Sequence, residues 1–118
     1  MFTNYKKLYE NYVNGIEELW NNRKTKFSIA ESRDISEFDE GYFNTLSDFY
    51  VDYLSKYKVH DQICNIKIIN YRERCRDIVE RINNLHFKAM EESKIYGPFD
   101  EYVNGFLDCA RDLLAIIY

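Results

Sequence analysis

Residues 61–92 carry an unbroken heptad pattern, and this stretch constrains the fold more than any other. Such a seam is typical of a helix that packs against other helices along its length. The pattern therefore predicts one long helix over about residues 61–92, around which the rest of the chain is arranged. The seam consists of small or apolar residues in alternating steps of four and three: Cys64, Ile68, Tyr71, Cys75, Ile78, Ile82, Leu85 and Ala89.

The same kind of periodicity predicts three further helices. They cover about residues 3–21, 36–58 and 99–117, and each has an apolar stripe opposite a polar face. Gly15 lies inside the first of them, where glycine costs about 1 kcal/mol relative to alanine. We expect either that a neighbouring helix passes close to Gly15 or that the cost is tolerated.

Local signals set the expected helix ends. Residues 22–35 lack periodicity and are interpreted as a connection, and Ser36 with Asp39 has the spacing of an N-terminal capping box. Residues 59–61 are expected to form a tight turn with Asp61 as the N-cap of the long helix. The pair Gly97-Pro98 predicts a stop, with the proline in the first turn of the last helix.

Short links between the last three helices force neighbours to run antiparallel. We therefore predict an all-α fold, an antiparallel up-down four-helix bundle that forms a single domain over residues 1–118. A hydrophobic content of 46% supplies enough core for one domain of this length. The helix over residues 61–92 would be about 50 Å long. This length exceeds the diameter of a compact domain of 118 residues. The helix should therefore either break at Asn83-Asn84 or extend beyond its own bundle.

Composition excludes several classes of function. The net charge is −4, and no segment has the basic excess of a phosphate-contacting surface, which argues against nucleic-acid binding. No cofactor or metal motif is present, so neither is expected. No apolar run approaches the roughly 20 residues that span a bilayer. The N-terminus lacks the order of a signal peptide, and the three cysteines lie on apolar faces. We expect a cytoplasmic protein without a membrane segment.

The absence of catalytic motifs favours a non-enzymatic protein that acts by binding a protein partner. Small acidic helical proteins of this build include toxin-neutralising immunity proteins and virus- or plasmid-borne inhibitors of host defence, an analogy of size and class. A homodimer is also expected, because the long seam and the wide apolar face of the last helix exceed what one chain should cover. The expected partner-binding residues lie in the 22–40 connection, the tyrosine stripe and the basic row: Phe27, Arg33, Asp34, Glu37, Asp39, Tyr42, Tyr53, Tyr57, Lys67 and Arg74.

Two of these groups have an alternative structural interpretation. Tyrosines at helical spacing can pack in a core while their hydroxyls reach its edge. The basic row of Lys67, Arg74, Arg81 and Lys88 can pair with acids of an adjacent helix, as such positions do in bundles.

One local pattern suggests an enzyme as the alternative. The segment from Arg81 to His86 has an arginine and a histidine separated by four residues. It resembles the core motif of HEPN ribonucleases, all-helical proteins whose dimers bring two such motifs to a shared RNA-cleaving cleft. The resemblance implies that His86 transfers a proton and that Arg81 holds the scissile phosphate. Alternatively, the two residues are edge positions on a bundle helix.

Overall fold

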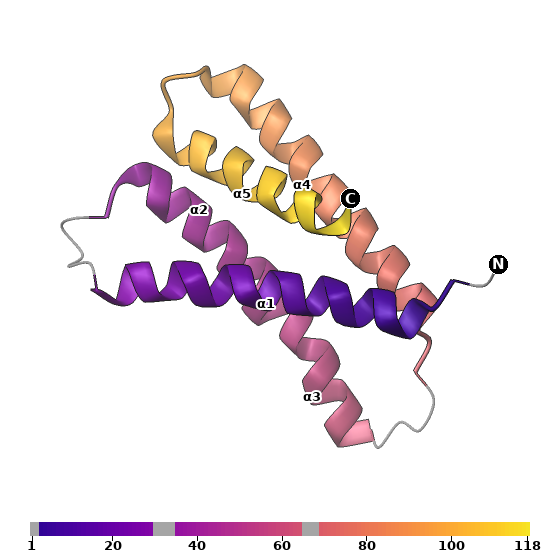
Figure 1. Cartoon of the computed structure of the whole chain (residues 1–118). Helices are drawn as coiled ribbons and strands as arrows, with labels where there is room; N and C mark the ends of the chain where they lie inside the picture. The colour runs from indigo at the N-terminus through magenta and orange to yellow at the C-terminus, as the bar shows by residue number, and fades with distance from the viewer. Residues whose placement is uncertain (1–2, 30–34, 65–68) are drawn as a thin grey trace.

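The computed structural model describes residues 3–29, 35–64 and 69–118, apart from the side chains of residues 25–29 and 64. These residues form an all-helical bundle without strands, which confirms the predicted fold class. Four helical rods alternate in direction along the chain (Figure 1). The elements are α1 (Tyr5–Ile29), α2 (Glu37–Ser47), the π-helical segment η2 (Asp48–Leu54), α3 (Ser55–Cys64), α4 (Tyr71–Tyr96) and α5 (Glu101–Ile117).

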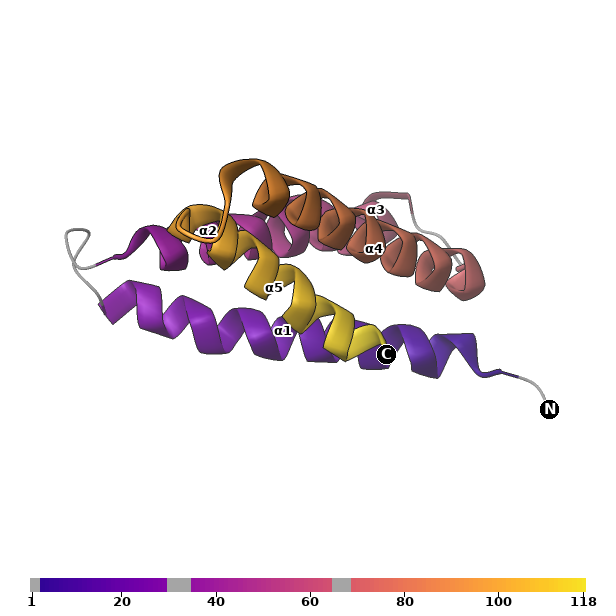
Figure 2. The ribbon, with the colours of Figure 1, turned by 90° about the horizontal axis from the view of Figure 1, so that it is seen from above.

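Helix α5 is the central element of the bundle. Figure 2 shows it between α1 on one side and α2 and α4 on the other, and it contacts all three. The α2, η2 and α3 elements follow one another without interruption and form one rod. Burial of apolar side chains from every rod is the main source of stability in such a bundle. The most deeply buried side chains include Ile16, Tyr42, Leu46, Phe49, Ile78, Ile82, Cys109 and Leu113.

The prediction of one helix over residues 61–92 is wrong at its start. Residues 61–64 end α3, and α4 begins only at Tyr71. The reason is a cap: the Asn70 side chain accepts a hydrogen bond from the backbone N–H of Glu73 at 3.1 Å. From Tyr71 onward the seam does face the core. Helix α4 runs unbroken through Asn83-Asn84, and its 26 residues fit within the 47 Å longest dimension of the bundle.

The other helix ends are partly as predicted. The first helix continues to Ile29 instead of ending near residue 21, and the turn predicted at residues 59–61 is wrong because α3 runs through it. The predicted start at Ser36 is confirmed as an N-cap, since Ser36 Oγ accepts a hydrogen bond from the Asp39 N–H at 3.1 Å. Gly97 ends α4 with φ of 77°, as predicted for a glycine stop.

Pro98 does not occupy the first turn of the last helix. It lies in the turn before α5, which begins at Glu101 with Asp100 as its N-cap. The Asp100 Oδ1 atom accepts a hydrogen bond from the Val103 N–H at 3.0 Å. A carboxylate at an N-cap satisfies a free backbone donor and also suits the helix dipole. This cap replaces the proline signal as the start of α5.

Glycines mark the places where helices approach most closely. Gly15 of α1 lies under Ile116 of α5, whose Cγ2 is 2.8 Å from the position of a Cβ added to the glycine. A neighbouring helix therefore passes close to Gly15, one of the two alternatives expected. Gly41 of α2 and Gly105 of α5 lie even closer to backbone atoms of the opposite helix. The α2–α5 crossing therefore depends on two glycines.

Candidate functional site

The residues expected to bind a partner do not form one surface. Arg33, Asp34 and Lys67 lie outside the described residues, as does the side chain of Phe27 in α1. Glu37 is exposed and Asp39 half-buried in the first turn of α2. Tyr42 and Arg74 are buried, with 1% and 9% of their surface exposed. Among the described members of the set, only Tyr53, Tyr57 and Arg74 come together, at the junction of η2, α3 and α4.

Arg74 is held in a forked ion pair across the α3–α4 junction. Its two terminal nitrogens donate to the Asp61 carboxylate at 2.9 and 2.5 Å. The guanidinium also lies 4.5 Å from the ring centre of Tyr57 and 5.6 Å from that of Tyr9. Hydrogen bonding from Arg74 lowers the pKa of Asp61 below its ordinary value of 3.8. Arg74 therefore joins α1, α3 and α4. This agrees with the structural interpretation of the basic row, in which its cations pair with acids of an adjacent helix.

Arg81, another cation of the basic row, also packs on a tyrosine. The Arg81 guanidinium lies 4.2 Å from the ring centre of Tyr53, whose hydroxyl is 3.0 Å from that of Tyr57. Tyr53 lies in the π-helical segment η2 and Tyr57 in α3. At their junction Ser55 donates its hydroxyl to the Tyr50 carbonyl at 3.0 Å. Burial raises the pKa of Tyr53, which keeps its hydroxyl protonated. These tyrosines pack between helices, as in the structural interpretation.

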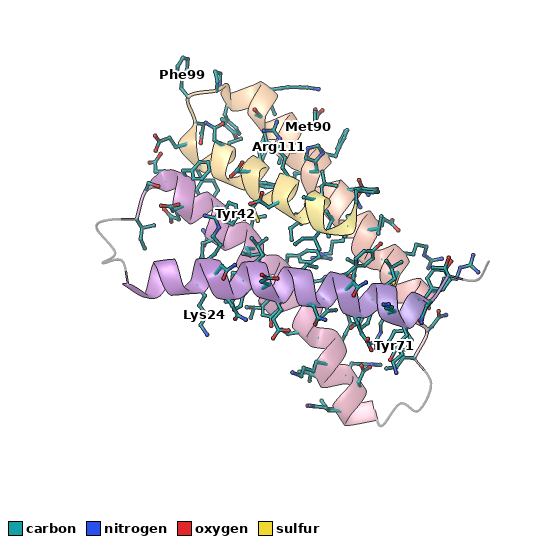
Figure 3. The ribbon with its side chains drawn as sticks, in the orientation of Figure 1. Lys24, Tyr42, Tyr71, Met90, Phe99 and Arg111 are labelled. Carbon is teal, nitrogen blue, oxygen red and sulfur yellow. The ribbon has the colours of Figure 1, made fainter. Side chains whose placement is uncertain are left out.

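Tyr42 has a comparable role on the opposite end of the same rod. Tyr42, which is labelled in Figure 3, donates its hydroxyl to Asp112 of α5. The Arg23 guanidinium of α1 lies 4.3 Å from the Tyr42 ring centre. Arg23 also approaches Asp112, at 3.8 Å. Burial raises the pKa of Tyr42, which keeps its hydroxyl protonated as a donor. The side chain therefore ties α1, α2 and α5 together.

An open hollow between α1 and α4 is the best candidate for a binding site. Its lining residues belong to the first turns of α1 and to the first half of α4 with its N-cap, and its volume is about 820 Å³. Figure 1 shows that these parts of the two helices lie near the N-terminus. We call this hollow the α1/α4 groove. Its floor combines buried and half-buried apolar side chains, namely Tyr5, Leu8, Tyr12, Cys75 and Val79, and its charged lining consists of Arg72, Glu73, Arg76 and Glu80.

The residues of the α1/α4 groove were not singled out from the sequence. Leu8 is the one visible signal, because it widens the apolar stripe of α1 beyond the seam that Tyr5 and Tyr12 define. Both tyrosines and Leu8 were assigned to the core by periodicity. Which part of a stripe is covered depends on where the next helix lies, and periodicity does not specify that.

The Arg81–His86 pattern gains no support from its surroundings. Arg81 is engaged with Tyr53, and the small hollow beside it is also lined by Asp77 and Glu80. Two carboxylates there would repel a phosphate. His86 is half-buried, and no hydrogen bond or ion pair of the described residues involves it. The ribonuclease therefore stays a prediction from the resemblance alone.

Searches for other sites and for relatives give no further assignment. In the described part of the chain, no group of histidine, cysteine and carboxylate side chains could hold a metal ion. Among the same residues, no helix combines the length and apolar character needed to cross a membrane. No protein-family model matches the chain, and comparison with curated proteins and with solved structures gives no match either.

Proposed function

We propose that this chain is a non-enzymatic interaction protein that binds a protein partner through the α1/α4 groove. The observation that carries the proposal is the groove itself, an open apolar floor with charged side chains around it. Apolar hollows of this kind, bordered by polar groups, are typical of binding sites. An inhibitor or immunity-type role, toxin-neutralising or anti-defence, is the class of activity we infer, by analogy of size and build.

A cytoplasmic location is part of the same proposal. Cys75 and Cys109 are both buried and unpaired, with 4% and 0% of their surface exposed. Burial raises the pKa of both thiols, so they remain protonated and act as small apolar groups. Reduced thiols of this kind are usual in a reducing compartment.

Photo-crosslinking from within the groove tests the proposed function. Leu8 would be replaced by a photoreactive benzoylphenylalanine, because its half-buried side chain lines the groove. The matched control places the same group at Val51, which is 45% exposed on η2. After irradiation in a native lysate, position 8 should label one protein and unmodified chain should compete for it. Equal labelling from both positions, or RNA cleavage by the purified protein without any labelling, would contradict the proposal.

Self-association into a two-fold homodimer is a separate part of the proposal. Phe87 and Met90 are 66% and 41% exposed one turn apart on α4, and Met90 is labelled in Figure 3. A second copy could cover both side chains. The two sequence-based arguments for a dimer no longer require one, because α4 does not extend beyond the bundle and α5 packs against three helices of the same chain. The exposed pair on α4 is therefore the basis of this proposal.

Sedimentation equilibrium tests the dimer. At tens of micromolar, the protein should have twice the 14.3 kDa mass of one chain. Phe87→Ser should restore the single-chain mass without loss of stability, because the phenylalanine is mostly exposed. A single-chain mass for the unmodified protein would refute the dimer and leave the α1/α4 groove untouched.

A further inference from the structure

The helix pair that forms the α1/α4 groove already holds a helix at its other end. Ile116 of α5 packs on Gly15 of α1, and the Tyr118 hydroxyl accepts a hydrogen bond from the Asn83 amide of α4 at 3.0 Å. The last turn of α5 thus rests on both helices. Toward the starts of α1 and α4 the described residues that line the groove come only from these two helices and the cap residue Asn70, and the groove is open there.

The floor of the groove has the spacing that a helix requires. Tyr5, Leu8 and Tyr12 follow one another in steps of three and four on α1, while Cys75 and Val79 are one turn apart on α4. Rows at these spacings accept the side-chain ridges of another helix. An extended peptide binds by adding to a sheet edge, and the described residues form no sheet. A helix satisfies the hydrogen bonds of its own backbone and needs no sheet edge to bind.

The charged residues beside the floor favour carboxylates on the occupant. At 100° per residue, the first charged row beyond Val79 around α4 consists of Arg72 and Arg76, while Glu73 and Glu80 lie farther round. Arg72 lies 5.9 Å from the Tyr5 ring centre, and no described carboxylate pairs with it. Arg76 is 69% exposed and only loosely paired, with Glu73 at 3.9 Å and with Asp77 at 3.8 Å. Both cations are therefore available to an incoming acid.

We infer that the α1/α4 groove takes an amphipathic helix of the partner protein, with its apolar face on the floor and carboxylates one turn apart against Arg72 and Arg76. This inference rests on the proposed function and names its ligand. The partner is a protein that presents an acidic amphipathic helix. Anchors on such a helix follow the i, i+3, i+4, i+7 pattern of helix-in-groove recognition.

Two synthetic peptides test the inference on the full chain. Each is a helix of about 14 residues, or about 21 Å, with leucines on one face. The first carries two glutamates one turn apart beside the leucines, and the second carries lysines there. In fluorescence anisotropy at low salt the glutamate peptide should bind about tenfold more tightly, because two ion pairs replace two repulsions. A higher salt concentration should reduce the difference in affinity between the two peptides, because salt screens the charges.

Charge-reversed variants locate the effect. The double substitution Arg72→Glu with Arg76→Glu should reverse the preference between the peptides. The control Lys88→Glu, together with Lys94→Glu, makes the same change in net charge at exposed positions outside the groove lining and should leave the preference unchanged. Circular dichroism of every variant should match that of the unmodified chain, because all four side chains are exposed.

Each remaining outcome overturns the inference. Equal affinity for both peptides would show that Arg72 and Arg76 do not select carboxylates. An equal change in preference in the control variant would show that the preference follows the net charge of the protein and not the groove. If neither peptide binds, the occupant is wrong. Labelling from position 8 would then still support the proposed function, so the two failures can be told apart.

Discussion

Gly105→Ala should destabilise the protein more than any other glycine-to-alanine change in the chain. A Cβ at position 105 would stand 2.0 Å from the carbonyl oxygen of Phe38 and 2.9 Å from the amide nitrogen of Tyr42. Both atoms belong to backbone, so only a separation of α2 and α5 can relieve the clash. Overpacking typically costs about 1–3 kcal/mol, and a rigid backbone clash in the central helix should cost at least about 3. Urea unfolding followed by circular dichroism measures it.

Gly41→Ala probes the same crossing from the other helix. Its Cβ would stand 2.1 Å from the Tyr102 carbonyl oxygen, so a comparable loss is expected. The double variant should lose less than the sum of the two single losses, because one separation of the helices relieves both clashes. Additive losses would mean that the two glycines do not share one crossing.

Gly15→Ala is the matched control for both variants. Its Cβ would meet the end of the Ile116 side chain at 2.8 Å, and a side chain can move where backbone cannot. The helix propensity of alanine also returns about 1 kcal/mol. The net change should therefore be small. If Gly105→Ala were no worse than Gly15→Ala, the close approach of α2 and α5 would be wrong.

These glycines show what helical periodicity reports and what it omits. The apolar stripes gave the fold class, because Ile16, Leu46, Ile78 and Leu113 all face the core from the helices in which the sequence places them. Periodicity describes one helix at a time. The distance between two helices depends on both faces together, so the role of Gly41 and Gly105 emerged only from the packed structure.

Helix ends were the least predictable feature, and each error has a local cause. The heptad register continues through the residues before Tyr71 in the sequence, but α4 begins only after the cap at Asn70. The Asn70–Glu73 spacing was a signal that the stronger pattern obscured. The assigned turn at residues 59–61 contains neither glycine nor proline, and α3 continues through it. The wider turn of the π-helical segment η2 produces no recognisable pattern in the sequence, so it could not be predicted.

The candidate site could not be predicted from the sequence, for a related reason. Tyr53, Tyr57 and Arg74 were singled out as contact residues by type, but they pack against one another. Tyr5 and Leu8 belong to the apolar stripe that predicts the first helix, yet α1 and α4 leave them under an open groove. Exposure is a property of the assembled helices, whereas residue type is a property of the sequence.

The Asp61–Arg74 pair should carry the largest polar contribution to stability. Asp61→Asn is expected to cost about 3 kcal/mol at neutral pH, because it leaves the Arg74 guanidinium, with a side chain 10% exposed, without its anion. The 26% exposure of the Asp61 side chain places the loss at the lower end of the range for buried pairs. Glu91→Gln is the control, since it removes an exposed acid paired with Lys94 at 3.4 Å and should change little.

The pH dependence of stability separates this ion pair from packing. The pKa of Asp61 is lower in the folded chain than its ordinary value of 3.8, so unfolded chains bind the proton more tightly. The contribution is therefore fully present above about pH 4 and is lost as the pH falls through the folded pKa. Below pH 4 the unmodified protein should lose stability more steeply than Asp61→Asn, and the two curves should converge. Parallel curves down to acid denaturation would show that Asp61 acts without its charge.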